Sequence, residues 1–111
     1  MISMRKENST NSLNEKSLQT FCNVHRVLSQ ISGRWKVSLI LALQYENLKY
    51  SSFKSILPDV SDRILAKQLK ELEDASIIYN EKDKTQSLYI LTEKGKKIVT
   101  VLITLGNIDK N

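Results

Sequence analysis

The sequence contains only one cysteine, one proline and three glycines in 111 residues. A single cysteine, Cys22, cannot form an internal disulfide, which excludes a disulfide-stapled secreted module. With one histidine, His25, in the whole chain, a zinc site of the Cys/His type is excluded as well. There is no phosphate-cradling glycine loop and no catalytic Ser-His-Asp set. We therefore expect no enzymatic activity, no cofactor and no metal.

Long apolar runs are also lacking. The longest, Leu39–Leu43, is far too short to span a membrane. The N-terminus has no apolar core of the length that a signal peptide needs. These absences predict a soluble, cytoplasmic protein with no membrane partner.

Basic residues outnumber acidic ones, 17 against 12, which gives a net charge of +5. This sign favours a polyanionic partner such as a nucleic acid. An apolar content of 41% is enough for a core, and the length suits one domain. We expect residues 1–15, which are polar and aperiodic, to form a flexible tail, and residues 16–111 to form a single domain.

Hydrophobic periodicity predicts five helices and two strands. The second helix is apolar on most of its circumference and should lie at the centre of the domain. After a short extended stretch at 47–50, we expect Ser51 or Ser52 to cap the third helix, and Pro58 to end it. The predicted helices cover about 21–30, 34–44, 52–57, 62–74 and 93–105, and the strands cover 77–80 and 87–91.

The helix at 62–74, with Ser61 as its N-cap, has two distinct faces. At 100° per residue, Leu65, Leu69 and Leu72 lie on one face. The opposite face carries three basic residues and one small residue, namely Arg63, Lys67, Lys70 and Ala66. Basic residues at the start of a helix oppose its macrodipole, which suggests that this end meets a negatively charged partner.

Three helices followed by a hairpin have the order of a winged helix-turn-helix. The predicted fold is therefore α+β and mostly helical, with a two-stranded wing and a C-terminal dimerisation helix. The major groove of DNA admits one helix, whose N-terminal side chains reach the base edges. We predict that the recognition helix 61–74 enters the groove and that the wing, 80–87, meets the backbone. The predicted DNA-binding residues are Ser61, Arg63, Ala66, Lys67 and Lys70 on the helix, and Lys82 and Lys84 on the wing.

From Ile98 onward the last helix is apolar on nearly every side. One domain of this size cannot cover so much apolar surface, but a second copy of the chain could. We therefore expect a homodimer, with dimerisation residues Ile98, Val101, Leu102 and Leu105.

An ordered set of motifs runs from Cys22 to about Leu105. It comprises Gly33-Arg34-Trp35-Lys36, Leu57-Pro58-Asp59-Val60-Ser61, Leu65-x-x-x-Leu69-x-x-Leu72-Glu73 and Tyr89-x-Leu91-Thr92-x-x-Gly95. This succession resembles the HxlR-type transcriptional regulators, a winged-helix group related to MarR. The resemblance implies a homodimeric DNA-binding repressor or activator, paired through its first and last helices, and so adds Phe21 to the interface.

The sequence departs from the family pattern at a few positions. Asn23 stands where a proline usually follows the cysteine, and Ser76 and Asn80 replace the glycine and arginine that usually follow the recognition helix. Because serine lacks the ease of glycine at positive φ, we expect a different cap at this helix end.

Cys22 has two interpretations. In some relatives a cysteine at this place acts as a thiol switch, and the neighbouring His25 and Arg26 would favour a thiolate. The alternative is a small, buried apolar residue. Of the other single residues, we expect Trp35 in the core and Tyr79 and Tyr89 in packing roles on the wing strands.

A second hypothesis is a protein-interaction module that keeps the winged fold without binding DNA. Residues 61–86 hold five basic and six acidic side chains, a net charge of −1, which is not typical of a strong non-specific DNA binder. No pattern indicates a small-molecule effector.

Overall fold

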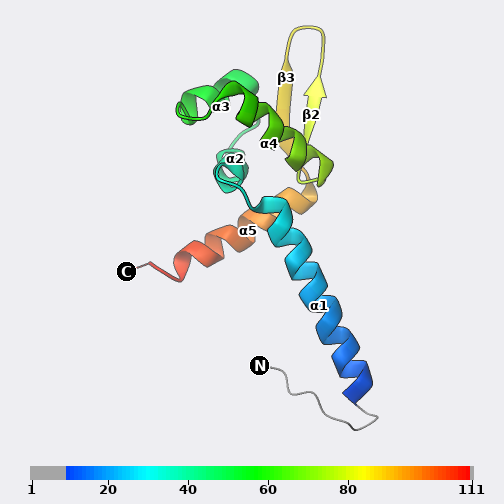
Figure 1. Cartoon of the computed structure of the whole chain (residues 1–111). Helices are drawn as coiled ribbons and strands as arrows, with labels where there is room; N and C mark the ends of the chain where they lie inside the picture. The colour runs from blue at the N-terminus through cyan, green and yellow to red at the C-terminus, as the bar shows by residue number, and fades with distance from the viewer. Residues whose placement is uncertain (1–9, 111) are drawn as a thin grey trace. The chain divides into compact units, whose positions relative to one another are not determined.

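The structure is a computed structural model that describes residues 10–110. It divides into two compact units, Met1–Gln30 and Ile31–Asn111. Its elements are α1 (Thr10–Ile31), α2 (Lys36–Ala42), β1 (Leu48–Lys49), α3 (Tyr50–Ile56), α4 (Asp62–Asp74), β2 (Ile78–Lys82), β3 (Ser87–Leu91) and α5 (Glu93–Asn107) (Figure 1).

The first unit contains α1, which begins earlier than expected. The prediction of a flexible tail over 1–15 is wrong for residues 10–15, which are helical, whereas residues 1–9 lie outside the described residues. Once a helix is nucleated, each further residue adds a backbone hydrogen bond, so polar residues extend it without apolar contacts. We predicted a single domain over 16–111, whereas the structure places residues up to Gln30, nearly all of α1, in a separate compact unit. Exposed apolar side chains follow the helical spacing along α1, at Leu18, Phe21, Val24 and Leu28.

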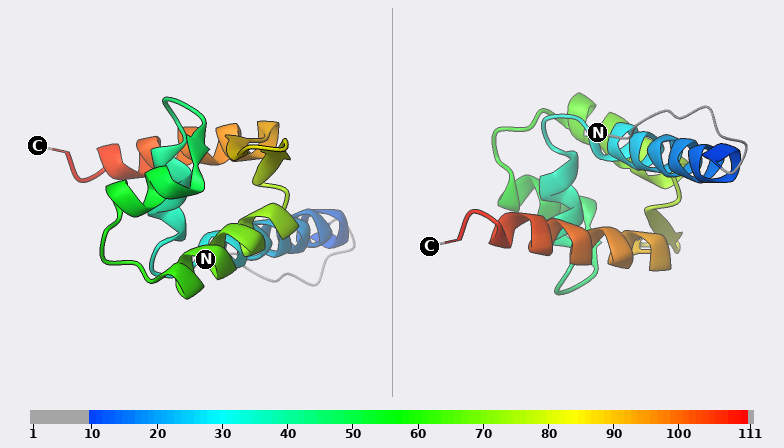
Figure 2. Two further views of the ribbon diagram at one scale, coloured as in Figure 1. Left: turned by 90° about the horizontal axis from the view of Figure 1, so that it is seen from above. Right: turned by 90° about the horizontal axis from the view of Figure 1, so that it is seen from below.

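The second unit is built around α2, as its all-round apolar sequence predicts. Leu39 and Ile40 are completely buried, and α2 lies between α4 and α5 in both views of Figure 2. The helix is shorter than the predicted 34–44, because Trp35 is its N-cap residue. The expectation that Trp35 lies in the core is wrong. Its side chain is only partly buried, and the Arg34 guanidinium lies 4.9 Å from the centre of its ring.

The sheet has three antiparallel strands in the order β1-β3-β2, one more than the predicted wing. Leu48 of β1 pairs with Tyr89 of β3, which in turn pairs with Asn80 of β2. The Tyr89 ring is buried edge-on against Phe53, with 5.7 Å between the ring centres, so its predicted packing role is confirmed. Tyr79 is 46% exposed, and its predicted packing role is wrong. Its side chain points to the opposite face of the strand from the buried Ile78.

Candidate nucleic-acid interface

The helix predicted to read DNA has the predicted bounds. α4 begins at Asp62, and the Ser61 hydroxyl accepts a hydrogen bond from the backbone N–H of Ile64 at 3.2 Å. Ser61 thus serves as the N-cap, which satisfies one of the free N–H groups of the first turn. The three leucines at 65, 69 and 72 are fully buried, so α4 packs on the domain through the predicted face.

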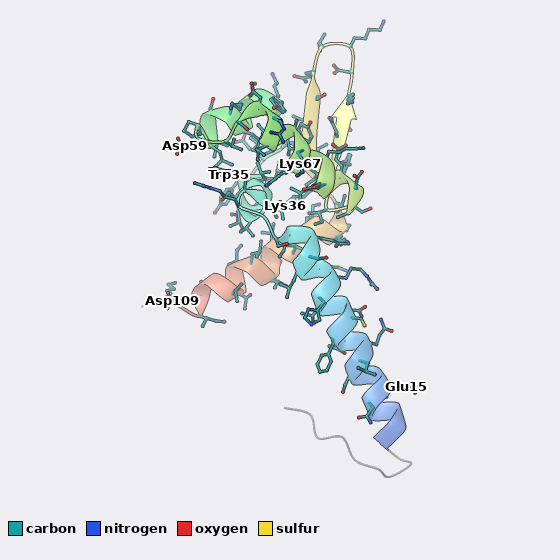
Figure 3. The ribbon with its side chains drawn as sticks, in the orientation of Figure 1. Glu15, Trp35, Lys36, Asp59, Lys67 and Asp109 are labelled. Carbon is teal, nitrogen blue, oxygen red and sulfur yellow. The ribbon has the colours of Figure 1, made fainter. Side chains whose placement is uncertain are left out.

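The opposite face of α4 is exposed, as the spacing predicts. All four predicted residues, Arg63, Ala66, Lys67 and Lys70, are exposed, and Figure 3 shows Lys67 on this helix. The Lys70 ammonium lies 3.3 Å from the Asp74 carboxylate one turn later, an exposed pair of small energetic value. Within residues 10–110, the side chains of Arg63 and Lys67 form no ion pair, so they are available to an external anion.

The first turn of α4 is fastened to α3 by two contacts that the sequence did not predict. The Tyr50 hydroxyl donates a hydrogen bond to the backbone carbonyl of Asp62 at 3.0 Å. The Lys54 ammonium lies 3.2 Å from the Asp62 carboxylate and also donates to the Val60 carbonyl. The pairing with Lys54 offsets the negative charge at the end of α4 where Arg63 lies. α3 itself begins at Tyr50 after Lys49, so the prediction that Ser51 or Ser52 caps it is wrong.

The end of α4 adopts the cap that glycine usually provides. Ser76 has φ of 61°, its N–H donates to the Glu73 carbonyl at 2.9 Å, and the Ile77 N–H donates to the Leu72 carbonyl at 3.0 Å. This pair of hydrogen bonds defines a Schellman motif. The expectation of a different cap is therefore wrong: the geometry is retained, and serine takes the left-handed conformation at some cost in strain.

The start of α5 is bonded to the end of α4. Thr92 caps α5 as predicted, since its hydroxyl accepts from the Gly95 N–H at 3.0 Å. The same hydroxyl donates to the Ser76 carbonyl at 2.6 Å, and the Thr92 N–H donates to the Ile77 carbonyl at 3.0 Å. The Lys94 ammonium donates to the Ala75 carbonyl at 2.8 Å. The carbonyls of the three residues that follow α4 are thus held by Thr92 and Lys94 at the start of α5.

The wing is longer and its tip is tighter than predicted. β2 continues through Lys82, which pairs with Ser87, so Lys82 lies on a strand and Lys84 on the tip. The Asp83 carboxylate closes the tip by accepting from the N–H groups of Thr85 and Gln86, both at 2.8 Å, and from the Thr85 hydroxyl. These donors stabilise the charged form and lower the pKa of Asp83. Lys82 and Lys84 are both exposed.

The predicted dimerisation residues separate into two groups. Ile98 is only 7% exposed and packs in the core of its own unit, so its predicted place on an open surface is wrong. The side of α5 that carries Ile98 packs against α2 and β3, which cover the apolar side chains on that side. Leu102 is partly buried, whereas Val101 and Leu105 are 64% and 60% exposed. On α1, Phe21 is about half exposed.

Cys22 is exposed on α1, so the alternative of a buried packing residue is wrong. Among residues 10–110 no three His, Cys, Asp or Glu side chains are grouped to hold a metal ion. In the same part of the chain, no helix combines the length and the apolarity needed to cross a membrane.

Three helices, a small antiparallel sheet with a projecting hairpin, and an exposed basic face on the third of these helices define a winged helix-turn-helix. A statistical model of the HxlR-like helix-turn-helix family matches residues 30–111, and the chain belongs to this family of transcriptional regulators.

Sequence and structure comparisons agree with this assignment. An uncharacterized HTH-type transcriptional regulator of Methanothermobacter thermautotrophicus is 31% identical over 87 residues, which cover 76% of this chain and 66% of that protein. The matched part therefore spans just under two thirds of this relative. The redox regulator HypR in its oxidized form has a TM-score of 0.69 and 29% identity, covering 81% of this chain and 99% of HypR. A MarR-family regulator from Porphyromonas gingivalis has the same fold, with a TM-score of 0.74 and 17% identity over 99% of this chain and 100% of that one.

Proposed function

We propose that this protein regulates transcription by binding a specific double-stranded DNA sequence as a homodimer. The observation that carries the proposal is α4, a helix held at both ends and packed through three leucines, which leaves Arg63, Lys67 and Lys70 on its outer face. A helix of this kind fits the major groove, and the wing beside it reaches the flanking backbone. We place the regulator in the cytoplasm, in the same compartment as the DNA that it is proposed to bind.

The residues of this surface are assigned different tasks. Arg63 lies in the first turn of α4, where side chains reach the base edges, and its planar guanidinium can pair with a guanine. Lys67 and Lys70 follow about one and two turns later and contact bases or phosphates. Lys82 and Lys84 of the wing contact only the backbone, which carries no sequence information.

The test is a binding titration with DNA from upstream of the protein's own gene and with scrambled DNA, each at several salt concentrations. Arg63→Ala is expected to cost about 1–3 kcal/mol on the operator and to relax the preference at one base position of each half-site. Lys84→Ala is expected to weaken both DNAs alike and to make the salt dependence shallower by about one unit.

Two outcomes contradict the proposal. If no fragment is bound at low salt, the chain is the protein-interaction module that the net charge of −1 over residues 61–86 allows. If Arg63→Ala weakens both DNAs equally while Lys84→Ala changes the sequence preference, the assigned docking of α4 and the wing is wrong.

Dimerisation is supported by apolar side chains that each unit leaves uncovered. On α5 and its C-cap these are Val101, Ile103, Leu105 and Ile108, and on α1 they are Leu18, Phe21, Val24 and Leu28. Burying a few hundred Å² of such surface contributes several kcal/mol at about 25 cal/mol per Å². Light scattering at micromolar concentration is expected to give the mass of a dimer, and a monomer would contradict this part of the proposal.

A thiol response through Cys22 is the regulatory part of the proposal. It is supported by the exposure of Cys22 and by the similarity to HypR, a redox regulator with structures in reduced and oxidized forms. Oxidation by diamide would join two Cys22 thiols, or Cys22 and a small thiol, with two electrons and two protons passing to diamide. Diamide is expected to change the affinity for the operator, and Cys22→Ser to abolish this change. Equal affinities of oxidised and reduced protein would exclude the response.

A further inference from the structure

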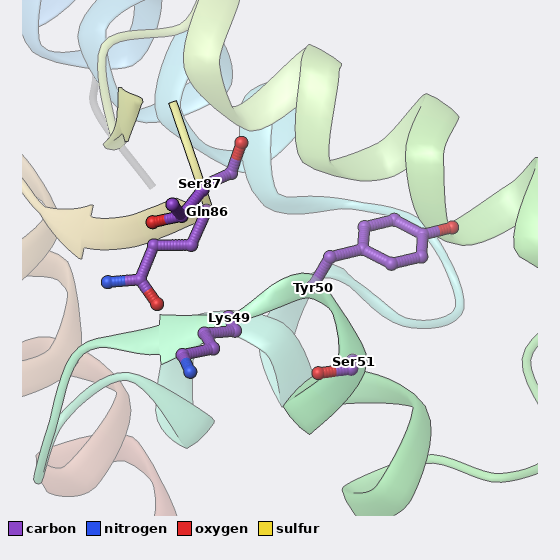
Figure 4. Close-up of a pocket in the computed structure, with 6 residues that line it drawn as sticks. Lys49, Tyr50, Ser51, Gln86 and Ser87 are labelled. Carbon is purple, nitrogen blue, oxygen red and sulfur yellow. The ribbon is translucent and has the colours of Figure 1, made fainter. Parts of the chain in front are cut away.

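An open groove of about 620 Å³ lies between the start of α3 and the part of the wing where its tip leads into β3 (Figure 4). Two segments far apart in the sequence form it. All six lining residues have a polar side chain, and they are Lys49, Tyr50, Ser51, Thr85, Gln86 and Ser87.

Four of these side chains have no partner among residues 10–110. The Tyr50 hydroxyl is bonded to Asp62, and the Thr85 hydroxyl to Asp83. The Lys49 ammonium, the Gln86 amide and the hydroxyls of Ser51 and Ser87 form no hydrogen bond or ion pair within this part of the chain. The groove thus presents one cation and three neutral donors with no internal acceptor to bind.

No carboxylate lines this groove. The two acidic residues that are hydrogen-bonded to lining residues are already engaged. Asp83, two residues before Thr85, accepts three hydrogen bonds at the wing tip, and Asp62 is paired with Lys54. A cation with neutral donors and no competing carboxylate suits an anion with several acceptor oxygens, such as a phosphate.

The position of the groove identifies the source of this phosphate. Tyr50, one of its lining residues, is bonded to the first residue of α4. Gln86, another, is the last residue of the wing tip. The groove therefore lies between the two elements that contact DNA in the proposed function, on which this inference rests.

We infer that the groove binds one phosphate of the DNA backbone, between the stretch read by α4 and the stretch met by the wing. Lys49 pairs with the phosphate charge, and Ser51, Gln86 and Ser87 donate hydrogen bonds to its oxygens. The contact fixes the register of the protein on the duplex and reads no base. It also adds a cation to an interface whose segment 61–86 has a net charge of −1.

The test compares Lys49→Gln with Lys110→Gln, both at exposed positions and each removing one positive charge. Lys110 lies beyond the end of α5 and does not line the groove. Affinities of wild type and both variants are measured on operator and scrambled DNA from 50 to 200 mM salt. Lys49→Gln is expected to weaken the binding of both DNAs by the same factor and to lower the salt slope by about 0.9. Between 50 and 200 mM salt, the affinity of the wild type should therefore fall by about 3–4-fold more than that of the Lys49→Gln variant. Lys110→Gln should leave the slope unchanged.

A methylphosphonate scan of the operator then locates the contact. At one backbone position, replacing the charged phosphate is expected to weaken the wild type and the Lys110→Gln variant, and to leave Lys49→Gln unaffected. If the wild type binds DNA but Lys49→Gln matches Lys110→Gln in slope and in the scan, the groove inference is wrong and the proposed function stands. If the wild type binds no DNA, the proposed function itself fails.

Discussion

Replacing Gly95 with alanine tests the junction between the end of α4 and the start of α5. Gly95 lies in the first turn of α5, and a Cβ atom built there would be 2.2 Å from the Ile77 carbonyl oxygen and 2.9 Å from Leu91 Cδ2. No real Cβ tolerates such a distance to backbone, so the start of α5 must move away from Ile77. That movement stretches the 3.0 Å bond from the Thr92 N–H to the Ile77 carbonyl and disturbs the Thr92 cap.

The expected loss follows from these contacts. Losing one backbone hydrogen bond costs about 1 kcal/mol, losing an N-cap about another, and overpacking about 1–3 kcal/mol. The higher helix propensity of alanine recovers about 1 kcal/mol. We therefore expect Gly95→Ala to lower the free energy of unfolding by about 2–4 kcal/mol.

Urea denaturation followed by circular dichroism, at one fixed protein concentration, measures the change. With a denaturant slope of about 2 kcal/mol per M, the midpoint should fall by about 1–2 M. Gly106→Ala is the matched control, because it lies in the same helix and a Cβ there would meet nothing within 4 Å. The control is expected to be neutral or more stable by up to about 1 kcal/mol. If the two variants gain stability alike, helix propensity alone governs both positions and the assigned close contact at Gly95 is refuted.

Three further predictions follow from other contacts. Ser76→Gly should raise the free energy of unfolding by about 0.5–1 kcal/mol, because glycine adopts φ of 61° without strain; an unchanged urea midpoint would contradict this. The Asp83 carboxyl should titrate below its ordinary pKa of 3.8 in an NMR titration, and Thr85→Ala should move the midpoint upward. Because the pKa of Asp83 is lowered in the folded protein, its hydrogen bonds at the wing tip stabilise the fold above pH 3.8, and this stabilisation is lost as the pH falls through the pKa of folded Asp83. A titration midpoint of 3.8 or higher would refute these hydrogen bonds. Leu105→Asp, at a 60% exposed position, should give monomers in light scattering with unchanged circular dichroism, and a persistent dimer would exclude α5 from the interface.

Local patterns in the sequence determined the elements that lie along one stretch of chain. The bounds of α4, its Ser61 cap, its three buried leucines and its exposed basic face were all predicted correctly. They depend on helical periodicity and on hydrogen bonds within three or four residues, which neighbouring residues specify by themselves. The Thr92 cap of α5 was predicted for the same reason. The ordered motifs from Cys22 to Leu105 were enough to identify the family.

Contacts between distant segments were decided only by the tertiary structure. Ser76 takes a positive φ because the chain must turn sharply there. The turn closes the cap of α4 and brings the Ser76 carbonyl to the hydroxyl of Thr92, 16 residues later. β1 becomes a third strand only because β3, about 40 residues further on, supplies its hydrogen-bonding edge. Ile98 is buried although its sequence neighbours Val101 and Leu105 are not, because only one side of α5 faces the core. The groove at Lys49 likewise forms only when the wing lies beside the start of α3. The local pattern of neither segment, 49–51 or 85–87, predicts that the two lie together.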